Sequence, residues 1–265
     1  MKDKKQSGPQ ALSRINFNSS RLIRFLADLA IADGAESKQT FPQRLGQWVS
    51  FTDANTLYTA LGSKAAQATV KPSKAQAGAK SAAYLVVNEE LTRVRTALVD
   101  LIKRSCSPAL GTARINFPTP TSDTPPEIAA SYLPFHRFYL ALQRDMDARV
   151  APLRVMVRDT LMTASPALKQ LAALDTALDG ILGDRERRLF GAVPLLLEKR
   201  FEQLRKVHQQ QLVGSGKTDD PATWMEPRAW LADFRDELVE ILLAELDVRL
   251  QPTMGLIEAF SNEVN

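Results

Sequence analysis

The sequence predicts an all-α protein, a long-helix bundle with a separate N-terminal helical pair, and three observations support this prediction. Glycine is sparse, with 12 residues in a chain of 265. Ala, Leu, Arg, Glu and Gln, which favour helix, dominate the composition. Apolar residues recur every three or four positions, whereas the alternation with a period of two that marks strands is almost absent. With 45% hydrophobic residues, the chain can bury a sizeable core.

At the N-terminus we expect a basic, flexible tail over residues 1–18 and a pair of short helices within residues 19–62. In the first helix the apolar residues recur at helical spacing behind two serines that can serve as N-caps. The second helix, over residues 42–58, follows a capping-box pattern formed by Thr40 and Gln43. Two helices of this size cannot bury their apolar stripes on each other alone.

The second of these helices carries large apolar side chains that predict a docking surface. The residues are Leu45, Trp48 and Phe51. A basic linker over residues 63–82, rich in Lys, Ala, Ser and Gln, lets the helical pair reach away from the rest of the chain. We therefore expect these three side chains to bind a protein partner, or to be exchanged between protomers of a homo-oligomer.

Residues 83–265 are predicted to form a helical bundle. Its first helix covers residues 85–104 and leads into a proline-rich strap at 107–126, where the prolines are too dense for a helix interior. A long helix with one buried stripe follows over residues 127–162, and we expect it to be kinked near Pro152.

Three more helices complete the predicted bundle. The first covers residues 166–183 and ends at its last residue, a glycine. The second covers residues 184–212 and is interrupted at Pro194. The third covers residues 228–250, and a short helix follows Pro252.

Two segments of the bundle, residues 145–152 and 245–252, share the pattern acid, apolar, Asp, x, Arg, apolar, x, Pro. In both, the proline lacks an N–H and leaves a carbonyl one turn back, which Arg149 or Arg249 could satisfy. A shared packing corner and an internal duplication both remain compatible with so short a match.

The net charge of +4 is unevenly distributed. Residues 1–80 carry 12 basic and 5 acidic residues, a surplus of +7, which leaves 22 basic and 25 acidic residues, or −3, in the remainder. A basic segment is attracted to nucleic acid, acidic protein surfaces and anionic lipid alike. The candidate nucleic-acid contacts are Lys4, Lys5, Arg21, Arg24, Lys71 and Lys74.

The sequence also indicates the cellular compartment in which we expect the protein. Its first residues lack the apolar core of a secretory signal, and no apolar run approaches the roughly 20 residues that span a bilayer. The single cysteine, Cys106, suits a reducing compartment. We therefore expect a cytoplasmic protein without direct membrane insertion, peripheral at the inner membrane only through a partner.

No motif predicts an enzyme, a cofactor or a metal site. Residues 214–218, GSGKT, resemble the end of a phosphate-binding loop, but the first glycine of that motif is replaced by Gln211 and the preceding segment is helical. The only two histidines, His136 and His208, lie on different helices, whereas zinc needs three or four ligands. Cys106 is either a nucleophile activated by nearby basic residues or a buried thiol, and its position at a helix end opposes a thiolate.

Carboxylate pairs are numerous but do not form acid/base pairs of the kind that enzymes use. Asp145 and Asp147, like Glu245 and Asp247, stand two residues apart on a helix and therefore do not face one another. Glu186 lies among three arginines. We expect these carboxylates to belong to solvated faces or to salt bridges.

Several blocks of the chain resemble a known family. They are SRLIRFLADLAIAD at 20–33, QRLGQWVSFTDA at 43–54, DMDARVAPLR at 145–154, SPALKQLAALD at 165–175, GDRERRLFGAVPLLLEKRFEQLR at 183–205 and ELDVRLQPTMGLIEA at 245–259. They are similar to an uncharacterised proteobacterial family known as a domain of unknown function, along the whole chain. The resemblance implies no catalytic residues. It implies loci that also encode a membrane protein similar to proton-driven motor stators and a peptidoglycan-binding, outer-membrane-protein-like partner.

We therefore expect a non-enzymatic accessory or adaptor subunit that docks onto a larger, membrane-motor-like assembly, with a stator-like membrane protein as the first candidate partner. The alternative is a nucleic-acid-binding protein that acts through its basic N-terminal third. A salt titration of binding to arbitrary duplex DNA separates the two, because phosphate contacts give a steep salt dependence.

Overall fold

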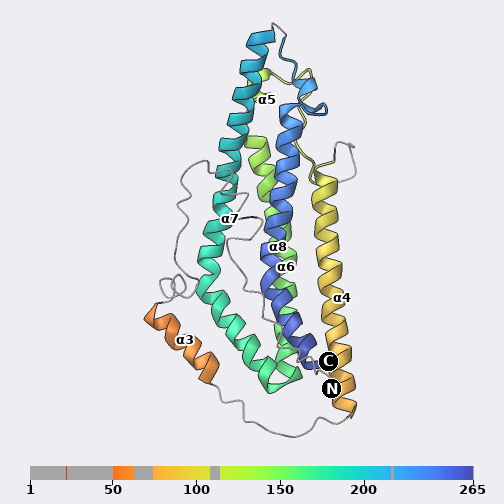
Figure 1. Cartoon of the computed structure of the whole chain (residues 1–265), viewed down its shortest axis with the longest axis vertical. Helices are drawn as coiled ribbons and strands as arrows, with labels where there is room; N and C mark the ends of the chain where they lie inside the picture. The colour runs from red at the N-terminus through yellow and green to blue at the C-terminus, as the bar shows by residue number, and fades with distance from the viewer. Residues whose placement is uncertain (1–21, 23–49, 63–73, 108–113, 216–217, 265) are drawn as a thin grey trace, which may run out of the picture.

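The computed structural model describes residues 22, 50–62, 74–107, 114–215 and 218–264 (Figure 1). All regular secondary structure in these ranges is helical, which confirms the all-α prediction. Four long helices form the body: α4 (Lys74–Ser105), α6 (Leu133–Ala164), α7 (Pro166–Ser215) and α8 (Trp230–Val264). Three short elements accompany them: α3 (Phe51–Gly62), α5 (Pro126–Ala129) and the 3-10 helix η2 (Pro221–Met225).

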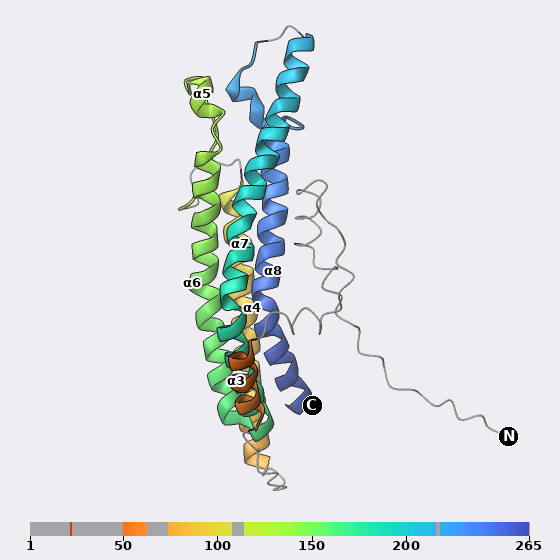
Figure 2. The ribbon, with the colours of Figure 1, turned by 90° about the vertical axis from the view of Figure 1, so that its left-hand side faces the viewer.

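The four long helices run alternately up and down along one axis (Figures 1 and 2). Helices α4 and α7 each contact both α6 and α8, and α6 also contacts α8, so α6 and α8 occupy the centre of the bundle. The 50 residues of α7 correspond to a length of about 75 Å. The result is an elongated bundle with an up-down-up-down order.

The turn between α6 and α7 shows how local chemistry sets the helix ends. Pro166 opens α7, where the missing N–H of a proline costs nothing. The preceding Ser165 caps this helix, because its Oγ accepts a hydrogen bond from the N–H of Leu168 at 3.2 Å. The same hydroxyl donates to Glu263 near the end of α8 at 2.7 Å, which ties this turn to the C-terminal helix.

The predicted helix breaks inside the bundle are wrong. Helix α7 continues through Gly183 and Pro194, and α8 continues through Pro252. Pro194 removes the donor that would serve the carbonyl of Phe190 one turn earlier, but the side chain of Gln143 on α6 donates to this carbonyl at 3.1 Å. The neighbouring helix thus satisfies the group that the proline leaves without a partner.

The boundaries at the N-terminal side also differ from the prediction. Helix α4 begins at Lys74, so the second half of the predicted linker at 63–82 is helical. Helix α3 starts after Ser50, whose Oγ accepts from the N–H of Asp53 at 3.2 Å while the carboxylate of Asp53 accepts from the N–H of Ser50 at 2.9 Å. This capping box starts a helix at residue 51, so the predicted helix over 42–58 is not continuous through Ser50.

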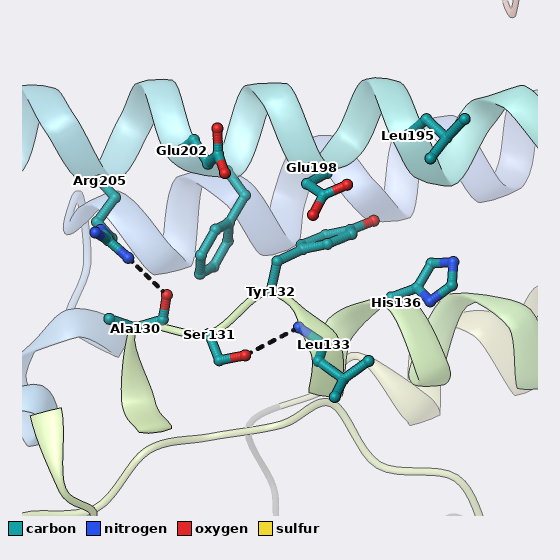
Figure 3. Close-up of a pocket in the computed structure, with 10 residues that line it drawn as sticks. Ala130, Ser131, Tyr132, Leu133, His136, Leu195, Glu198, Glu202 and Arg205 are labelled. Atoms are coloured by element: carbon teal, nitrogen blue, oxygen red, sulfur yellow. Dashed lines mark hydrogen bonds between the residues drawn. The ribbon is translucent and has the colours of Figure 1, made fainter. Parts of the chain in front are cut away.

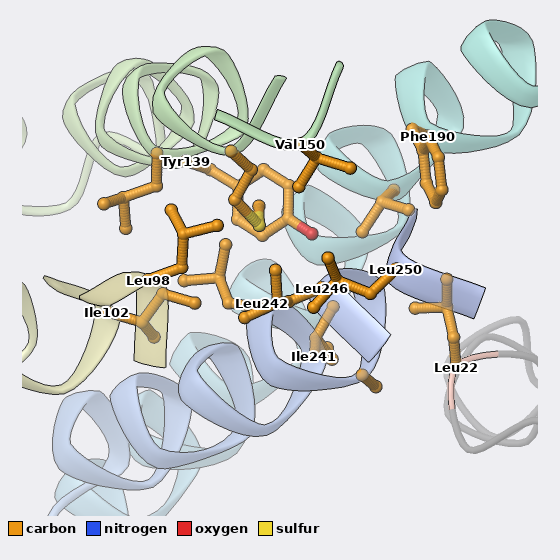
Figure 4. Packing of buried hydrophobic residues seen from close by; sticks show 14 of the residues in the cluster. Leu22, Leu98, Ile102, Tyr139, Val150, Phe190, Ile241, Leu242, Leu246 and Leu250 are labelled. Carbon is orange, nitrogen blue, oxygen red and sulfur yellow. The ribbon is translucent and has the colours of Figure 1, made fainter. Parts of the chain in front are cut away.

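Helix α3 packs against α7 (Figure 2). The side chain of Gln170 on α7 donates a hydrogen bond to the carbonyl of Leu61 on α3 at 2.7 Å. Leu22, from the predicted first helix, is only 1% exposed and belongs to the core cluster of the bundle (Figure 4). The N-terminal segment therefore contacts the bundle at Leu22 and through α3.

One continuous hydrophobic core runs through the bundle. Leucines and isoleucines from α4, α6 and α8 meet in it, and Figure 4 shows Leu98 and Ile102 of α4 facing Leu242 and Leu246 of α8. These side chains are spaced by three or four residues along each helix, as the sequence periodicity predicts. Polar side chains are also buried among the described residues, and Glu245 with Gln143 is one such group.

Candidate functional site

A polar cleft of about 600 Å³ lies between α6, α7 and α8, and we call it the central cleft. Its polar and charged lining residues are Gln143, Asp147, Arg154, Arg158, Asp179, Glu186, Arg187 and Arg249. None of its lining residues is a Ser, Thr, Tyr, Cys, His or Lys. The cleft is therefore rich in charge, and carboxylates are the only side chains in its lining of a type that enzymes use as nucleophiles.

The spacing of charged residues along two neighbouring helices places them in the cleft. On α6, Arg154 and Arg158 stand four residues apart, one turn of helix. On α7, Asp175 and Asp179 have the same spacing. Since the two helices are antiparallel and joined by a short turn, the arginine pair of one faces the aspartate pair of the other.

The floor of the central cleft is a buried hydrogen-bond network centred on Glu245 of α8, whose side chain is completely buried. Two groups of α6 donate to its carboxylate: the Tyr139 hydroxyl at 2.5 Å and the Gln143 amide at 2.9 Å. Arg249, one turn further along α8, donates through Nε at 2.8 Å and Nη2 at 2.6 Å. Each oxygen of the buried carboxylate thus has partners, which a charged group in the interior requires.

Arg249 links this floor to the other two helices. Its Nη1 donates to Asp147 of α6, and its guanidinium lies 3.9 Å from the centroid of the Phe190 ring of α7, a cation–π geometry. Burial first, and then the charge of Glu245, raise the pKa of Tyr139 well above its usual value. Tyr139 therefore remains a neutral hydrogen-bond donor.

The wall of the cleft consists of the four-residue ion-pair network between α6 and α7. Arg154 donates to Asp175 at 2.7 Å and to Asp179 at 2.8 Å, while Arg158 donates to the same two carboxylates at 2.6 and 2.9 Å. Burial alone would raise the pKa of Asp175, but the hydrogen bonds and charges of the two arginines outweigh it and lower this pKa below its usual value. Asp175 therefore contributes stability above its unfolded pKa, and that stability is lost as the pH falls through its folded pKa.

Glu186 of α7 also lines the cleft, and its environment differs from that of the other acids. Partial burial is the largest influence and raises the pKa of its carboxyl above the ordinary value of 4.5, while Arg154 and Arg249 oppose the shift without cancelling it. A raised pKa in the folded state means that folding disfavours the charged form of this side chain.

We expect Glu186→Gln to increase the free energy of unfolding at neutral pH, because it removes a charge that folding desolvates. The gain should shrink as the pH falls through the folded pKa of Glu186 and vanish below its ordinary value of 4.5, where the wild-type carboxyl is protonated in both states. Urea denaturation followed by circular dichroism across this pH range measures both effects. Glu202→Gln, at an exposed glutamate of the same helix, is the control and should change stability by no more than about 0.5 kcal/mol. A destabilising Glu186→Gln would contradict the prediction.

A second hollow, the upper groove, has a volume of about 420 Å³ and lies between the start of α6 and the outer part of α7 (Figure 3). The buried ring of Tyr132 forms its floor, and the Tyr132 hydroxyl donates to the carbonyl of Pro194 at 2.8 Å. Arg205 donates to the carbonyl of Ala130 at 2.8 Å across the groove. Glu198 and Glu202 lie at its rim. These two hydrogen bonds tie the start of α6 and the residues before it to α7.

The predicted partner-binding and nucleic-acid-binding residues fall mostly outside the described part of the chain. This holds for Leu45, Trp48, Lys4, Lys5, Arg21, Arg24 and Lys71. Phe51 and Lys74 are the first residues of α3 and α4. Both roles therefore stay predictions.

The described residues also show the surroundings of the candidate metal ligands and of the candidate nucleophile Cys106. They contain no group of three His, Cys, Asp or Glu side chains that could hold a metal ion. His136 lines the upper groove, whereas His208 contacts Asp219 at 3.0 Å and does not line that groove. Cys106 is buried, and burial raises the pKa of its thiol to about 12, so the thiolate needed for nucleophilic attack is disfavoured. Within these ranges no helix combines the length and the apolarity needed to cross a membrane.

The residues before the segment 214–218 are helical, as the sequence predicted, although the helix ends at Ser215 rather than at residue 212. The described ranges contain no strand. A phosphate-binding loop needs a strand before it to aim its backbone N–H groups. The absence of nucleotide binding itself stays a prediction.

The carboxylate pairs are mostly salt-bridge partners, one of the two predicted roles. Asp145 accepts from Arg114 at 2.9 Å, and Asp247 accepts from Arg95 at 3.1 Å. Glu245 is also a salt-bridge partner, of Arg249 at 2.6 Å, but its side chain is completely buried.

The two echoed segments, 145–152 and 245–252, meet in the central cleft. Arg249 of the second segment donates to Asp147 of the first, as well as to Glu245. The prediction that Arg249 would serve the carbonyl freed by a proline is wrong, because its hydrogen bonds go to carboxylates.

The comparisons with known proteins place the chain in a family. A search of curated proteins and a search of solved structures each found no match. A family model described as "Protein of unknown function (DUF3348)" matches residues 9–262, nearly the whole chain. This match confirms the predicted resemblance to a domain of unknown function. The chain therefore belongs to the DUF3348 family.

Proposed function

We propose that this chain is a non-enzymatic accessory subunit that docks onto a larger assembly through exposed helical surfaces. The observation that carries the proposal is an apolar strip on the outer face of α6. Val155 is 50% exposed and Met162 is 43% exposed on this strip. Val155 lines an open, shallow depression of about 800 Å³ together with Ala151, Pro152 and Met156, and the polar residues Asp159, Thr160 and Thr163 complete its lining. Exposed apolar side chains gathered on one face of a helix are typical of protein-binding sites.

The chemistry of the central cleft supports a binding role rather than catalysis. Its described acids other than Glu186 are held in ion pairs with arginines, and its lining offers no hydroxyl, thiol, imidazole or amine. Apart from the Glu186 carboxylate, the lining therefore offers no free side chain for general acid–base chemistry or nucleophilic attack.

The partner that we propose first is a stator-like membrane protein, on the basis of the family resemblance and the apolar strip. The full-length chain should be retained by this protein in detergent, and Val155→Glu combined with Met162→Glu should abolish the retention. Leu85→Glu is the matched control, since Leu85 is also a strongly exposed apolar residue, but on α4. Equal loss of retention in the control, or no loss in the double variant, would refute docking through α6.

The proposed role of the N-terminal segment is tested with the same partner. Burying an aromatic side chain contributes about 1.5 to 3 kcal/mol, so Trp48→Ala should weaken partner binding about tenfold or more.

The alternative function, nucleic-acid binding through the basic N-terminal third, rests on the surplus of +7 over residues 1–80. Tight binding to duplex DNA that weakens steeply with added salt would favour this alternative.

A further inference from the structure

Glu186 is the acid of the central cleft that has no hydrogen-bond or ion-pair partner among the described residues. Asp147 accepts from Arg249, and Asp179 accepts from Arg154 at 2.8 Å. Glu186 experiences the charges of arginines on both sides of the cleft but bonds to none of them. A partly buried carboxylate without a partner is costly to keep in a folded protein.

The ion pairs around the cleft leave an excess of negative charge. The two arginines of α6 are matched by the two aspartates of α7, and Arg187 is matched by Asp184. Arg249, in contrast, alone faces the two carboxylates of Asp147 and Glu245. The charged residues of the lining and their ion-pair partners are counted together. The four cations are Arg154, Arg158, Arg187 and Arg249, and the six anions are Asp147, Asp175, Asp179, Asp184, Glu186 and Glu245, which gives a net charge of −2.

Two glycines keep the cleft open on the α7 side. Gly183 and Gly191 lie in its lining, one turn before Glu186 and just over one turn after it. A Cβ at Gly191 would meet no atom within 4 Å, and one at Gly183 would meet only the mobile end of Arg187 at 3.4 Å. Close packing therefore does not require glycine at either position, although glycine in a helix costs about 1 kcal/mol relative to alanine.

The cleft also provides an apolar surface beside its charges. Val150, Ala151 and Val155 of α6 and Phe190 of α7 belong to its lining. Lys and Arg side chains have the same combination, an apolar stem that ends in a cation. The volume of about 600 Å³ lies within the usual range of ligand sites and exceeds what such a side chain needs.

We propose that the central cleft binds an alkyl-ammonium or alkyl-guanidinium group, with Glu186 as its ion-pair partner. The cation fills the place opposite the carboxylate that the protein leaves unpaired, and its stem lies against the apolar lining. A lysine or arginine side chain of another protein and a free polyamine share this chemistry. The central cleft shares Ala151 and Val155 with the apolar strip of α6, but Glu186 lines only the cleft, so variants of Glu186 test this inference separately from docking through α6.

Isothermal titration of the full-length chain at neutral pH tests the proposal with four probes. Agmatine represents the guanidinium, spermidine the free polyamine, and acetyl-Gly-Arg-Gly-amide a protein side chain. Inorganic phosphate is the probe of opposite charge. The wild-type chain should bind the cations and not phosphate. Tighter binding of the tripeptide than of spermidine identifies a protein side chain as the source, and the reverse order identifies a polyamine.

Two variants locate the binding in the cleft. Glu186→Gln should weaken cation binding about tenfold or more, because the charged partner is lost while the shape is kept. Since we expect this variant to be more stable than the wild type, the loss does not arise from unfolding. Glu202→Gln, in the upper groove, is its control and should bind as the wild type does. Gly191→Leu should block the cleft, whereas Gly180→Leu, at an exposed position of the same helix with equal space, should not.

The pH dependence gives an independent measurement. Glu186 is faced by Asp147, Arg154 and Arg158 of α6 and Arg249 of α8, and it shares α7 with Asp179 and Arg187. Cation binding should weaken as the pH falls through the titration of Glu186, and this dependence should be absent in Glu186→Gln. The proposal is overturned if the wild type binds none of the cations, if Glu186→Gln binds them equally well, or if phosphate binds instead.

Discussion

Replacing Glu245 with alanine is expected to lower the free energy of unfolding by about 3 to 5 kcal/mol. The substitution leaves the guanidinium of Arg249, which is only 9% exposed, without its buried partner. It also removes the acceptor of the Tyr139 hydroxyl and of the Gln143 amide, both in the interior. An unsatisfied buried polar group costs about 1 to 3 kcal/mol, so these losses reinforce one another.

Urea denaturation followed by circular dichroism measures this loss. Glu258→Ala is the control, because Glu258 is an exposed glutamate on the same helix, and it should change the free energy of unfolding by no more than about 0.5 kcal/mol. Glu245→Gln should fall between the two, since an amide oxygen can still accept from Tyr139 but no longer pairs with the charge of Arg249. Equal effects of Glu245→Ala and Glu258→Ala would show that the buried network does not stabilise the fold.

The position of Glu245 illustrates what could and could not be predicted from the sequence. From its pairing with Asp247, Glu245 was predicted to belong to a solvated face or to a salt bridge, and the salt bridge exists, with Arg249 four residues along the helix. Yet Glu245 is the only charged residue in the stretch ILLAEL at 241–246. A single acid within such an apolar run was a signal of burial. The donors from α6 were not predictable, because they lie more than 100 residues away in the chain.

The helix content and the long helix α6 were predictable because they depend on local periodicity. The stripe of apolar residues on α6 follows the spacing of a single helix, and the predicted range of 127–162 overlaps most of the observed 133–164. The start differs because residues 126–129 form the separate helix α5 and a turn follows them. Helix boundaries of this kind depend on a few local contacts and are harder to predict than the helix itself.

Helix α7 shows where local rules fail. Gly183 and Pro194 both disfavour helix, and each was interpreted as an end or an interruption. The structure continues through both because α7 packs against α6 and α8 along its length, and because Gln143 supplies the hydrogen bond that Pro194 takes from Phe190. That bond joins residues 47 apart in sequence, so no local pattern could indicate it.

The ion pairs that form the wall of the central cleft could have been predicted from the sequence. Arg154 and Arg158 stand four apart before the turn at Ser165, and Asp175 and Asp179 stand four apart after it. Opposite charges at matching spacing on two consecutive antiparallel helices are a pairing signal. The unpaired state of Glu186 was not predictable, since three arginines lie within two residues of it in sequence, and of these Arg187 pairs with Asp184 instead.

Phe201→Ala is expected to lower the free energy of unfolding by about 3 to 5 kcal/mol, because Phe201 is the centre of an aromatic cluster that joins α6, α7 and α8. Its ring is 1% exposed and lies 5.1 Å from Phe135, 5.2 Å from Trp230 and 5.3 Å from Phe234, between ring centroids. Each such pair contributes about 0.5 to 1.5 kcal/mol beyond the burial of its area, and alanine removes all of them at once.

The same substitution has a local readout in tryptophan fluorescence. The ring of Trp230 meets that of Phe201 edge to face and is tilted against that of Trp224. The indole N–H of Trp224 donates to Asp219 at 2.7 Å. Loss of the Phe201 ring should admit water beside Trp230 and shift the emission to longer wavelength before global unfolding begins. Leu195→Ala is the control on the same helix, since Leu195 is 59% exposed, and it should leave both the emission and the unfolding midpoint unchanged. The prediction is contradicted if Phe201→Ala leaves the emission unchanged and lowers the free energy of unfolding by less than about 1 kcal/mol. This end of the bundle would then pack less tightly than the ring distances indicate.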